Sequence, residues 1–239
     1  MNTSLHDRVL SAKGVVFDLF HTLTARESEW SEFPYTFQVL GVSRAAWEKQ
    51  LFDNSRFRLA GEERDPSRII SRMARAIDPA IGDEVVARAI RNRSQRFAKI
   101  LKNIPADNLA LLKALRNHAL KLGLVSNADC GEIASWESSP LAPLFDSTVF
   151  SCRVGHVKPE PAIFLHCLDE LQIHAEDSLF VGDGGALELK TARHLGFTTI
   201  MVTAIIQDLW PDKIEERARD ADFVVEFPAD ILPNEWRMA

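Results

Sequence analysis

Cysteine is scarce in this chain of 239 residues, which contains only Cys130, Cys152 and Cys167. Their number is odd, and no two of them form a CxxC pair. This pattern argues against both a disulfide framework and a zinc site. We therefore expect reduced thiols that are mostly buried.

Long apolar runs are also missing. No stretch of 18 uninterrupted apolar residues occurs, and the opening residues, MNTSLHDRVLSAKG, show no basic leader followed by an apolar segment. Neither a membrane-spanning helix nor a secretion signal is indicated, so we expect a cytoplasmic protein.

Positive charge is in deficit, because the net charge at pH 7 is −6. Nucleic acid is therefore not expected as a partner, since its phosphates repel an acidic surface. Residues 25–102 are the exception, with 15 lysines and arginines against 11 aspartates and glutamates. This excess fits either a solvated helix face or a field that attracts an anionic small molecule.

Short β-rich runs recur along the rest of the chain. They cover residues 14–20, 122–127, 147–151, 178–184, 198–203 and 221–227. Amphipathic helical patterns lie between the later runs, at residues 105–120, 160–171 and 188–195. Buried strands that alternate with helices predict an α/β fold with a doubly wound parallel sheet.

Residues 25–102 break this alternation. They show helical patterns over 37–52, 69–77 and 85–101, with proline at 66 and 79, and no convincing strand. We therefore expect a small α-helical domain of residues 25–102, inserted after the first strand into a core domain of residues 1–24 and 103–239. Residues 204–239 are expected to complete the sheet edge and to supply a terminal helix, with no visible chemistry.

Polar residues stand at the ends of the predicted strands. They are Asp18, Ser126 with Asn127, and Asp183, and Lys158 follows the third strand in GHVKPEP. Ligands of open parallel sheets bind outside the carboxyl ends of the strands, so these side chains should face one point. Two carboxylates, a hydroxyl and an ammonium suit Mg²⁺ beside a phosphate.

Four ordered motifs carry a resemblance to a known family. They read FDLFHTL, LVSN, VKPEPAIF and VGDGGALELKTARHLGF, and they anchor residues 14 to about 203. The chain resembles the haloacid dehalogenase superfamily of hydrolases, whose sheet core carries a mobile helical cap. The resemblance implies that Asp18 is a nucleophile that forms a covalent intermediate. By the same resemblance, Ser126 holds the transferring group and Lys158 neutralises charge.

The resemblance also implies a metal site and a substrate. Mg²⁺ would be held by Asp18, Asp183 and the backbone carbonyl of Phe20, with Glu188 ordering a metal-bound water. The substrate would be a small anionic metabolite, bound by Ser126 and Asn127 and, from the cap, by arginines such as Arg56 and Arg58. Trp30, Phe33 and Tyr35 could line the pocket or form the cap core. The chain is expected to be a monomer or homodimer.

Phe20 departs from the family pattern, because family phosphatases usually carry an aspartate at this position as general acid and base. One reading is a Mg²⁺-dependent phosphatase of small phosphorylated metabolites, which acts on activated phosphates or borrows an acid from elsewhere. A second is a metal-independent 2-haloacid dehalogenase, whose branch carries an aromatic residue here, although GDGGALE and Phe164 depart from that branch. A third is a catalytically weak binding protein. We favour the phosphatase.

Overall fold

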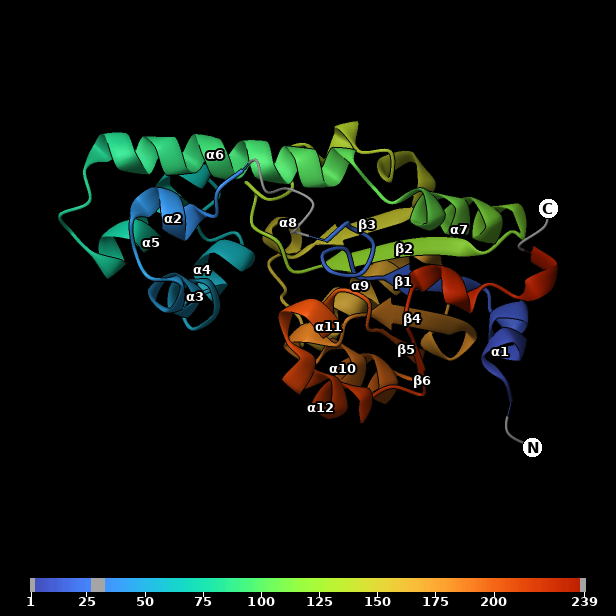
Figure 1. Cartoon of the computed structure of the whole chain (residues 1–239). Coiled ribbons are helices and arrows are strands. Elements are labelled where there is room, and N and C mark those ends of the chain that lie inside the picture. Colours follow the sequence, from blue (N-terminus) through green and yellow to red (C-terminus); the bar gives the residue numbers. More distant parts are fainter. Residues whose placement is uncertain (1–2, 27–32, 237–239) are drawn as a thin grey trace.

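The sheet of this protein has six parallel strands in the order β3-β2-β1-β4-β5-β6, as seen in the computed structural model, which describes residues 3–26 and 33–236 (Figure 1). The strands are β1 (Gly14–Phe17), β2 (Lys121–Ser126), β3 (Ser147–Phe150), β4 (Ser178–Gly182), β5 (Thr198–Val202) and β6 (Phe223–Val225). Five of them lie within the runs predicted as strands and β2 begins one residue before its run, so the predicted α/β fold with a parallel sheet is confirmed.

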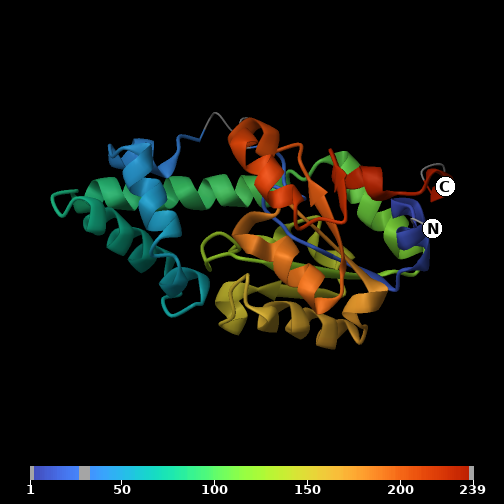
Figure 2. The ribbon, with the colours of Figure 1, turned by 90° about the horizontal axis from the view of Figure 1, so that it is seen from below.

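Both faces of the sheet are covered, which explains why the strands are apolar throughout. Val15 and Phe17 join one core cluster and Val16 the other, because successive side chains of a strand point to opposite faces. Helix α7 (Ala106–Asn117) packs into the first cluster with α1 (Leu5–Ser11), and α9 (Pro161–Leu171) packs into the second with α10 (Glu188–Leu195). Figure 2 shows α7 and α9 on opposite sides of the sheet.

A helical insertion stands between β1 and β2, as the sequence predicts. It contains α2 (Thr36–Leu40), α3 (Arg44–Phe52), α4 (Arg56–Leu59), α5 (Pro66–Ile77) and α6 (Asp83–Lys102). These helices, here called the cap, have a core of their own that includes Trp47, Met73 and Val86. The exact division of the chain at residues 24/25 and 102/103 stays a prediction.

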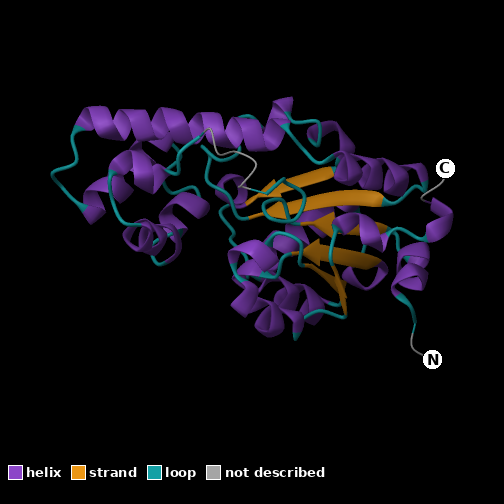
Figure 3. Ribbon diagram, in the orientation of Figure 1, coloured by secondary structure: helices purple, strands orange, loops and turns teal. Residues whose placement is uncertain are grey.

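Helix α6 joins the two cores. It is 20 residues long and runs from the cap to the sheet domain (Figure 3). Val86 near its start is buried in the cap core, and Leu101 near its end is buried in the sheet core. One continuous helix therefore connects the cap with the core around the sheet.

Two local predictions need correction. The pattern over residues 37–52 forms two helices, because Gly41 adopts a left-handed conformation (φ 71°) that ends α2. The terminal helix expected after the edge strand is wrong for the described residues. The short helices α11 (Ile206–Leu209) and α12 (Ile214–Ala218) precede β6, and only 3₁₀ turns follow it. Among the described residues, no helix is long and apolar enough to cross a membrane.

Candidate active site

Three carboxylates meet at the carboxyl ends of the central strands. Asp18 follows β1, Asp183 follows β4, and Glu188 is the first residue of α10. Each offers an oxygen within 4.8 Å of the oxygens of the other two, and all three side chains are buried. The predicted convergence of residues 18 and 183 is therefore present, because β1 and β4 are neighbouring parallel strands.

Lys158 lies between two of these acids. Its Nζ donates hydrogen bonds to Asp18 Oδ1 (2.6 Å) and to Glu188 Oε2 (2.5 Å). The backbone of Lys158 is held by the side chain of Asn127, which accepts from its N–H (2.8 Å) and donates to its carbonyl (3.1 Å). Asn127 therefore positions the lysine, and its contact with substrate stays a prediction.

Burial and mutual charge shift the acidities of this cluster. Burial raises the pKa of Asp18, and although Lys158 opposes the shift, the nearby Asp183 adds to it. Burial likewise raises the pKa of Glu188 to about 8, against the opposing effect of Lys158. For Lys158 burial alone would lower the pKa, but the two carboxylates raise it above its ordinary value. Lys158 is therefore protonated in the folded protein at neutral pH.

Close backbone approach fixes the acid at position 188. Glu188 Oε1 accepts a hydrogen bond from the N–H of Gly184 (3.0 Å). A Cβ atom on Gly182 would lie only 2.2 Å from the same oxygen, so any other residue here would displace the Glu188 carboxylate. The GDGG turn thus serves to bring a carboxylate against the end of β4.

The sequence analysis missed one residue of this cluster. Arg217 on α12 donates from NH1 to Asp183 Oδ2 (2.8 Å) and to the carbonyl of Asp183 (3.1 Å). No motif marks it, because KIEERARD looks like an ordinary solvated helix. Residues 204–239 therefore contribute a contact to the acidic cluster that the sequence does not indicate.

The donor set fits a divalent cation. When Asp18, Asp183 and Glu188 are ionised, Lys158 and Arg217 leave one negative charge unbalanced in a buried site. Carboxylate oxygens are the ligands that Mg²⁺ prefers, and each keeps lone pairs beyond the hydrogen bonds given above. The acidic cluster is thus consistent with a magnesium site, and a role for the carbonyl of Phe20 stays a prediction.

Ser126 ends β2 beside this cluster. Its hydroxyl oxygen is buried and has no hydrogen-bond partner among the described residues. Buried polar groups of native proteins are nearly always hydrogen-bonded, so a buried hydroxyl without a partner in this cleft is a candidate to bind a ligand. The geometry fits the predicted contact between Ser126 and a transferring group.

The two cap arginines predicted to bind substrate have different surroundings. Arg56 is 62% exposed in its side chain and forms an ion pair with Glu160 outside the cleft. Arg58 is buried, lines the cleft, and donates from NH1 to Asp129 Oδ2 (3.0 Å). Substrate binding by either arginine stays a prediction.

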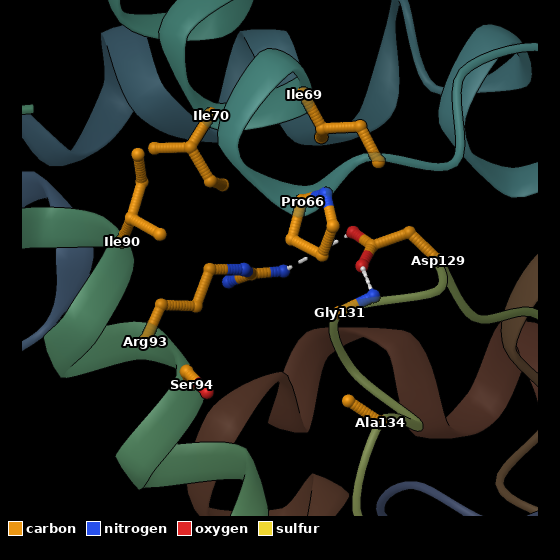
Figure 4. Close-up of a pocket in the computed structure, with 9 residues that line it drawn as sticks. All are labelled: Pro66, Ile69, Ile70, Ile90, Arg93, Ser94, Asp129, Gly131 and Ala134. Atoms are coloured by element: carbon orange, nitrogen blue, oxygen red, sulfur yellow. Dashed lines mark hydrogen bonds and ion pairs between the residues drawn. The ribbon is translucent and has the colours of Figure 1, made fainter. Parts of the chain in front are cut away.

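Arg58 belongs to a buried ionic cluster that joins the cap to the core. Arg93 on α6 contacts Glu132 (2.5 Å) and Asp129 (3.6 Å), two residues of the loop after β2. Figure 4 shows Arg93 and Asp129 joined by this ion pair beside a cavity of about 50 Å³, which Pro66 also lines. Burial raises the pKa of Glu132, and the neighbouring Asp129 adds to the shift. The cluster holds α4 and α6 against the core.

A cleft of about 670 Å³ lies between cap and core and includes the acidic cluster. Tyr35 lines it, as predicted for one alternative, whereas Phe33 is not among its lining residues. Trp30 lies outside the described residues. The cleft is large enough for a ligand much bigger than a phosphate ion.

Comparison with known proteins identifies the family. The model of the haloacid dehalogenase-like hydrolases matches residues 12–196, well over half of the chain. The chain therefore belongs to the haloacid dehalogenase-like hydrolase family.

Among curated relatives, the bifunctional epoxide hydrolase 2 of Rattus norvegicus is 32% identical over 110 residues, which cover 44% of this chain and 20% of that protein. The glyceraldehyde 3-phosphate phosphatase of Methanopyrus kandleri is 27% identical over 152 residues, 62% of each protein. This chain spans 11 to 20% of the length of the epoxide hydrolases that it matches in rat, pig and mouse.

Two solved structures share the fold. An L-2-haloacid dehalogenase from Xanthobacter autotrophicus, with chloropropionic acid covalently bound, aligns with a TM-score of 0.61 at 18% identity and covers 95% of this chain and all of that one. A phosphatase of the same family from Thermococcus onnurineus aligns with a TM-score of 0.57 at 18% identity, over 90% of this chain and 94% of that one. At such identities these matches establish the fold alone.

Proposed function

We propose that the protein is a Mg²⁺-dependent phosphatase of small phosphorylated metabolites that acts through a covalent intermediate on Asp18. The observation that carries this proposal is the buried cluster of Asp18, Asp183 and Glu188 with Lys158 bonded to the first and third. The glyceraldehyde 3-phosphate phosphatases among the relatives support phosphoryl chemistry.

Each residue of the cluster has a role in this reaction. The Asp18 carboxylate attacks phosphorus. Lys158, which is hydrogen-bonded to the same carboxylate, offsets the negative charge of nucleophile and phosphate. The unpaired hydroxyl of Ser126 donates to a phosphate oxygen. A bound Mg²⁺ would be held by Asp18 and Asp183, with Glu188 orienting its water, and would supply further charge neutralisation.

Phe20 restricts the substrate. The ring lines the cleft where the family's general acid usually stands, so no carboxyl group at this position protonates the leaving oxygen. A general acid contributes about 10²–10⁴-fold in rate, most of all for a poor leaving group. Substrates whose leaving group departs as a stable anion, such as acyl phosphates, therefore suit the site best.

Dehalogenation is the second candidate, and Phe20 is the observation that favours it. Halide leaves without a proton, and an aromatic residue at this position resembles the dehalogenase branch. However, a metal-free dehalogenase has no evident use for the buried carboxyl groups of Asp183 and Glu188. We therefore place it second, ahead of a binding protein without catalytic activity.

A screen of three substrates separates these functions. The phosphatase should release phosphate from acetyl phosphate and 4-nitrophenyl phosphate with Mg²⁺, and EDTA should abolish the activity. Metal-independent release of chloride from 2-chloropropionate would select the dehalogenase instead, and a binding protein would do neither. Asp18→Asn should eliminate turnover while the fold is retained, as checked by circular dichroism.

A further inference from the structure

Aromatic side chains line the cleft that includes the acidic cluster. They include Phe20 from the loop after β1, Tyr35, Phe37 and Phe97 from the cap, and Trp210 from the segment before α12. None of these five is fully buried, so their rings keep surface that a ligand in the cleft can cover. A three-carbon phosphate ester would leave most of a cleft of about 670 Å³ to water.

The wall beside the nucleophile consists of two phenylalanines. Phe20 lies edge to face with Phe97 of α6, with ring centroids 5.5 Å apart. The guanidinium of Arg93 lies over the Phe97 ring, 4.6 Å from its centroid. Phe20 and Phe97 line the same cleft as Asp18, so the pair presents an aromatic surface to a leaving group, which lies on the side of phosphorus opposite to Asp18.

At two further places in the cleft, an arginine guanidinium also lies against an aromatic ring. On the cap, Tyr35 stacks on Phe37 at 5.5 Å, and the guanidinium of Arg96 lies 4.0 Å from the Tyr35 centroid. On the core side, Arg217 lies 5.5 Å from the centroid of Trp210. Since Arg217 also donates to Asp183, Trp210 is linked to the acidic cluster through this arginine.

We propose that the leaving group of the natural substrate is an aromatic ring system whose oxygen departs as a stabilised anion, as in the phosphate of an aromatic acid or of a phenol. The inference rests on the proposed function and specifies its substrate class. Edge-to-face and stacked contacts between such a ring and the aromatic side chains of the cleft stabilise binding beyond the contribution of apolar burial alone.

The reaction balances without a general acid. The bond from Asp18 oxygen to phosphorus forms as the bond from phosphorus to the leaving oxygen breaks, and the electron pair departs with the carboxylate or phenolate. Water then attacks phosphorus, and the bond to Asp18 breaks. Both water protons remain on the released dihydrogen phosphate, and Asp18 returns as a carboxylate.

Acetyl phosphate and benzoyl phosphate give the sharpest comparison, because both release a carboxylate of similar basicity and only the second carries a ring. With the Mg²⁺-loaded protein we expect kcat/KM to be about tenfold higher for benzoyl phosphate, mainly through KM. Hydrolysis of both at equal kcat/KM would overturn the aromatic inference alone. If acetyl phosphate, benzoyl phosphate and 4-nitrophenyl phosphate are all left unhydrolysed, the proposed function is overturned as well. If both benzoyl phosphate and 4-nitrophenyl phosphate are substrates, their relative kcat/KM separates an acid from a phenol as the preferred source.

Variants test whether the aromatic side chains of the cleft cause the preference for benzoyl phosphate. Trp210→Leu and Phe97→Leu should each reduce the ratio of the two kcat/KM values, whereas Phe227→Leu, an exposed aromatic outside the cleft, should leave the ratio unchanged. Competitive inhibition by phenylphosphonate and methylphosphonate measures binding without turnover, and the phenyl compound should bind about tenfold more tightly to the parent protein. Equal inhibition constants, or a ratio that falls in the Phe227 variant as much as in the others, would contradict the inference.

Discussion

The ring of Phe20 meets the ring of Phe97 edge to face, with centroids 5.5 Å apart and planes at 83°. Phe20 lies two residues after Asp18, the proposed nucleophile, and Phe97 belongs to the helix that joins cap and core. The contact thus connects the loop that follows Asp18 to the cap. It also fills with an apolar ring the position where family phosphatases usually carry an acid.

Phe20→Asp should restore a general acid at a cost in stability. We expect the rate with phenyl phosphate, a poor leaving group, to gain at least about tenfold relative to the rate with 4-nitrophenyl phosphate. The melting temperature should fall, because the variant loses the ring pair with Phe97. Phe20→Asn is the matched control, since it loses the same ring without gaining an acid. An equal change with both substrates in the aspartate variant would show that the missing acid does not limit turnover.

Ser126→Ala should separate binding from stability. The Ser126 hydroxyl makes no hydrogen bond within the described protein, so its removal should leave the free energy of unfolding unchanged or slightly higher. The loss of a hydrogen bond to a charged phosphate oxygen should lower kcat/KM by about 10- to 100-fold. Denaturant unfolding and steady-state kinetics measure the two quantities. A destabilised variant with unchanged kcat/KM would assign the hydroxyl to structure instead.

Magnesium affinity should rise with pH because Glu188 must lose a proton. In an unfolded chain a glutamate titrates near 4.5, whereas the pKa of Glu188 in the folded protein is raised to about 8. The folded, metal-free protein therefore binds more protons than the unfolded chain between these values, and its stability should fall as pH rises through this window.

Since Mg²⁺ competes with that proton, the apparent affinity should increase by up to about tenfold per pH unit until pH 8 and then level off. Isothermal titration of Mg²⁺ between pH 6 and 9 measures this slope. Glu188→Gln should flatten it, and a pH-independent affinity in the parent protein would be inconsistent with a buried, protonated Glu188.

Arg58→Met should destabilise the protein far more than Arg56→Met, although the two arginines lie two residues apart. The change at 58 leaves Asp129 and Glu132 buried with Arg93 as the one remaining cation of the cluster, which we expect to cost about 3–5 kcal/mol of unfolding free energy. The exposed pair of Arg56 with Glu160 should contribute little. Urea unfolding of both variants tests this contrast, and equal losses would refute the role of the buried cluster.

The sequence predicts much of the fold because its signals are local. The continuous apolar run of Val15, Val16 and Phe17 predicts a strand covered on both faces, and proline and glycine separate the helices of the cap. The residues Asp18, Lys158 and Asp183 could be expected together because parallel strands end at one edge of a sheet.

Residues that reach the site from distant segments could not be predicted in this way. Arg217 approaches Asp183 from a short helix whose charge pattern is that of a solvent-exposed surface. The aromatic walls depend on how α6 places Phe97 over Phe20 and on how the segment before α12 places Trp210, and neither packing follows from local periodicity.

Release of phosphate from acetyl phosphate tests the central claim most directly. The measurement compares the parent protein with Asp18→Asn, each with excess Mg²⁺ and with EDTA. We predict turnover only in the parent protein with Mg²⁺, and after acid quenching a phosphoryl group on the peptide that contains Asp18. Turnover that persists in EDTA or in the Asp18 variant would contradict a metal-assisted attack by this carboxylate.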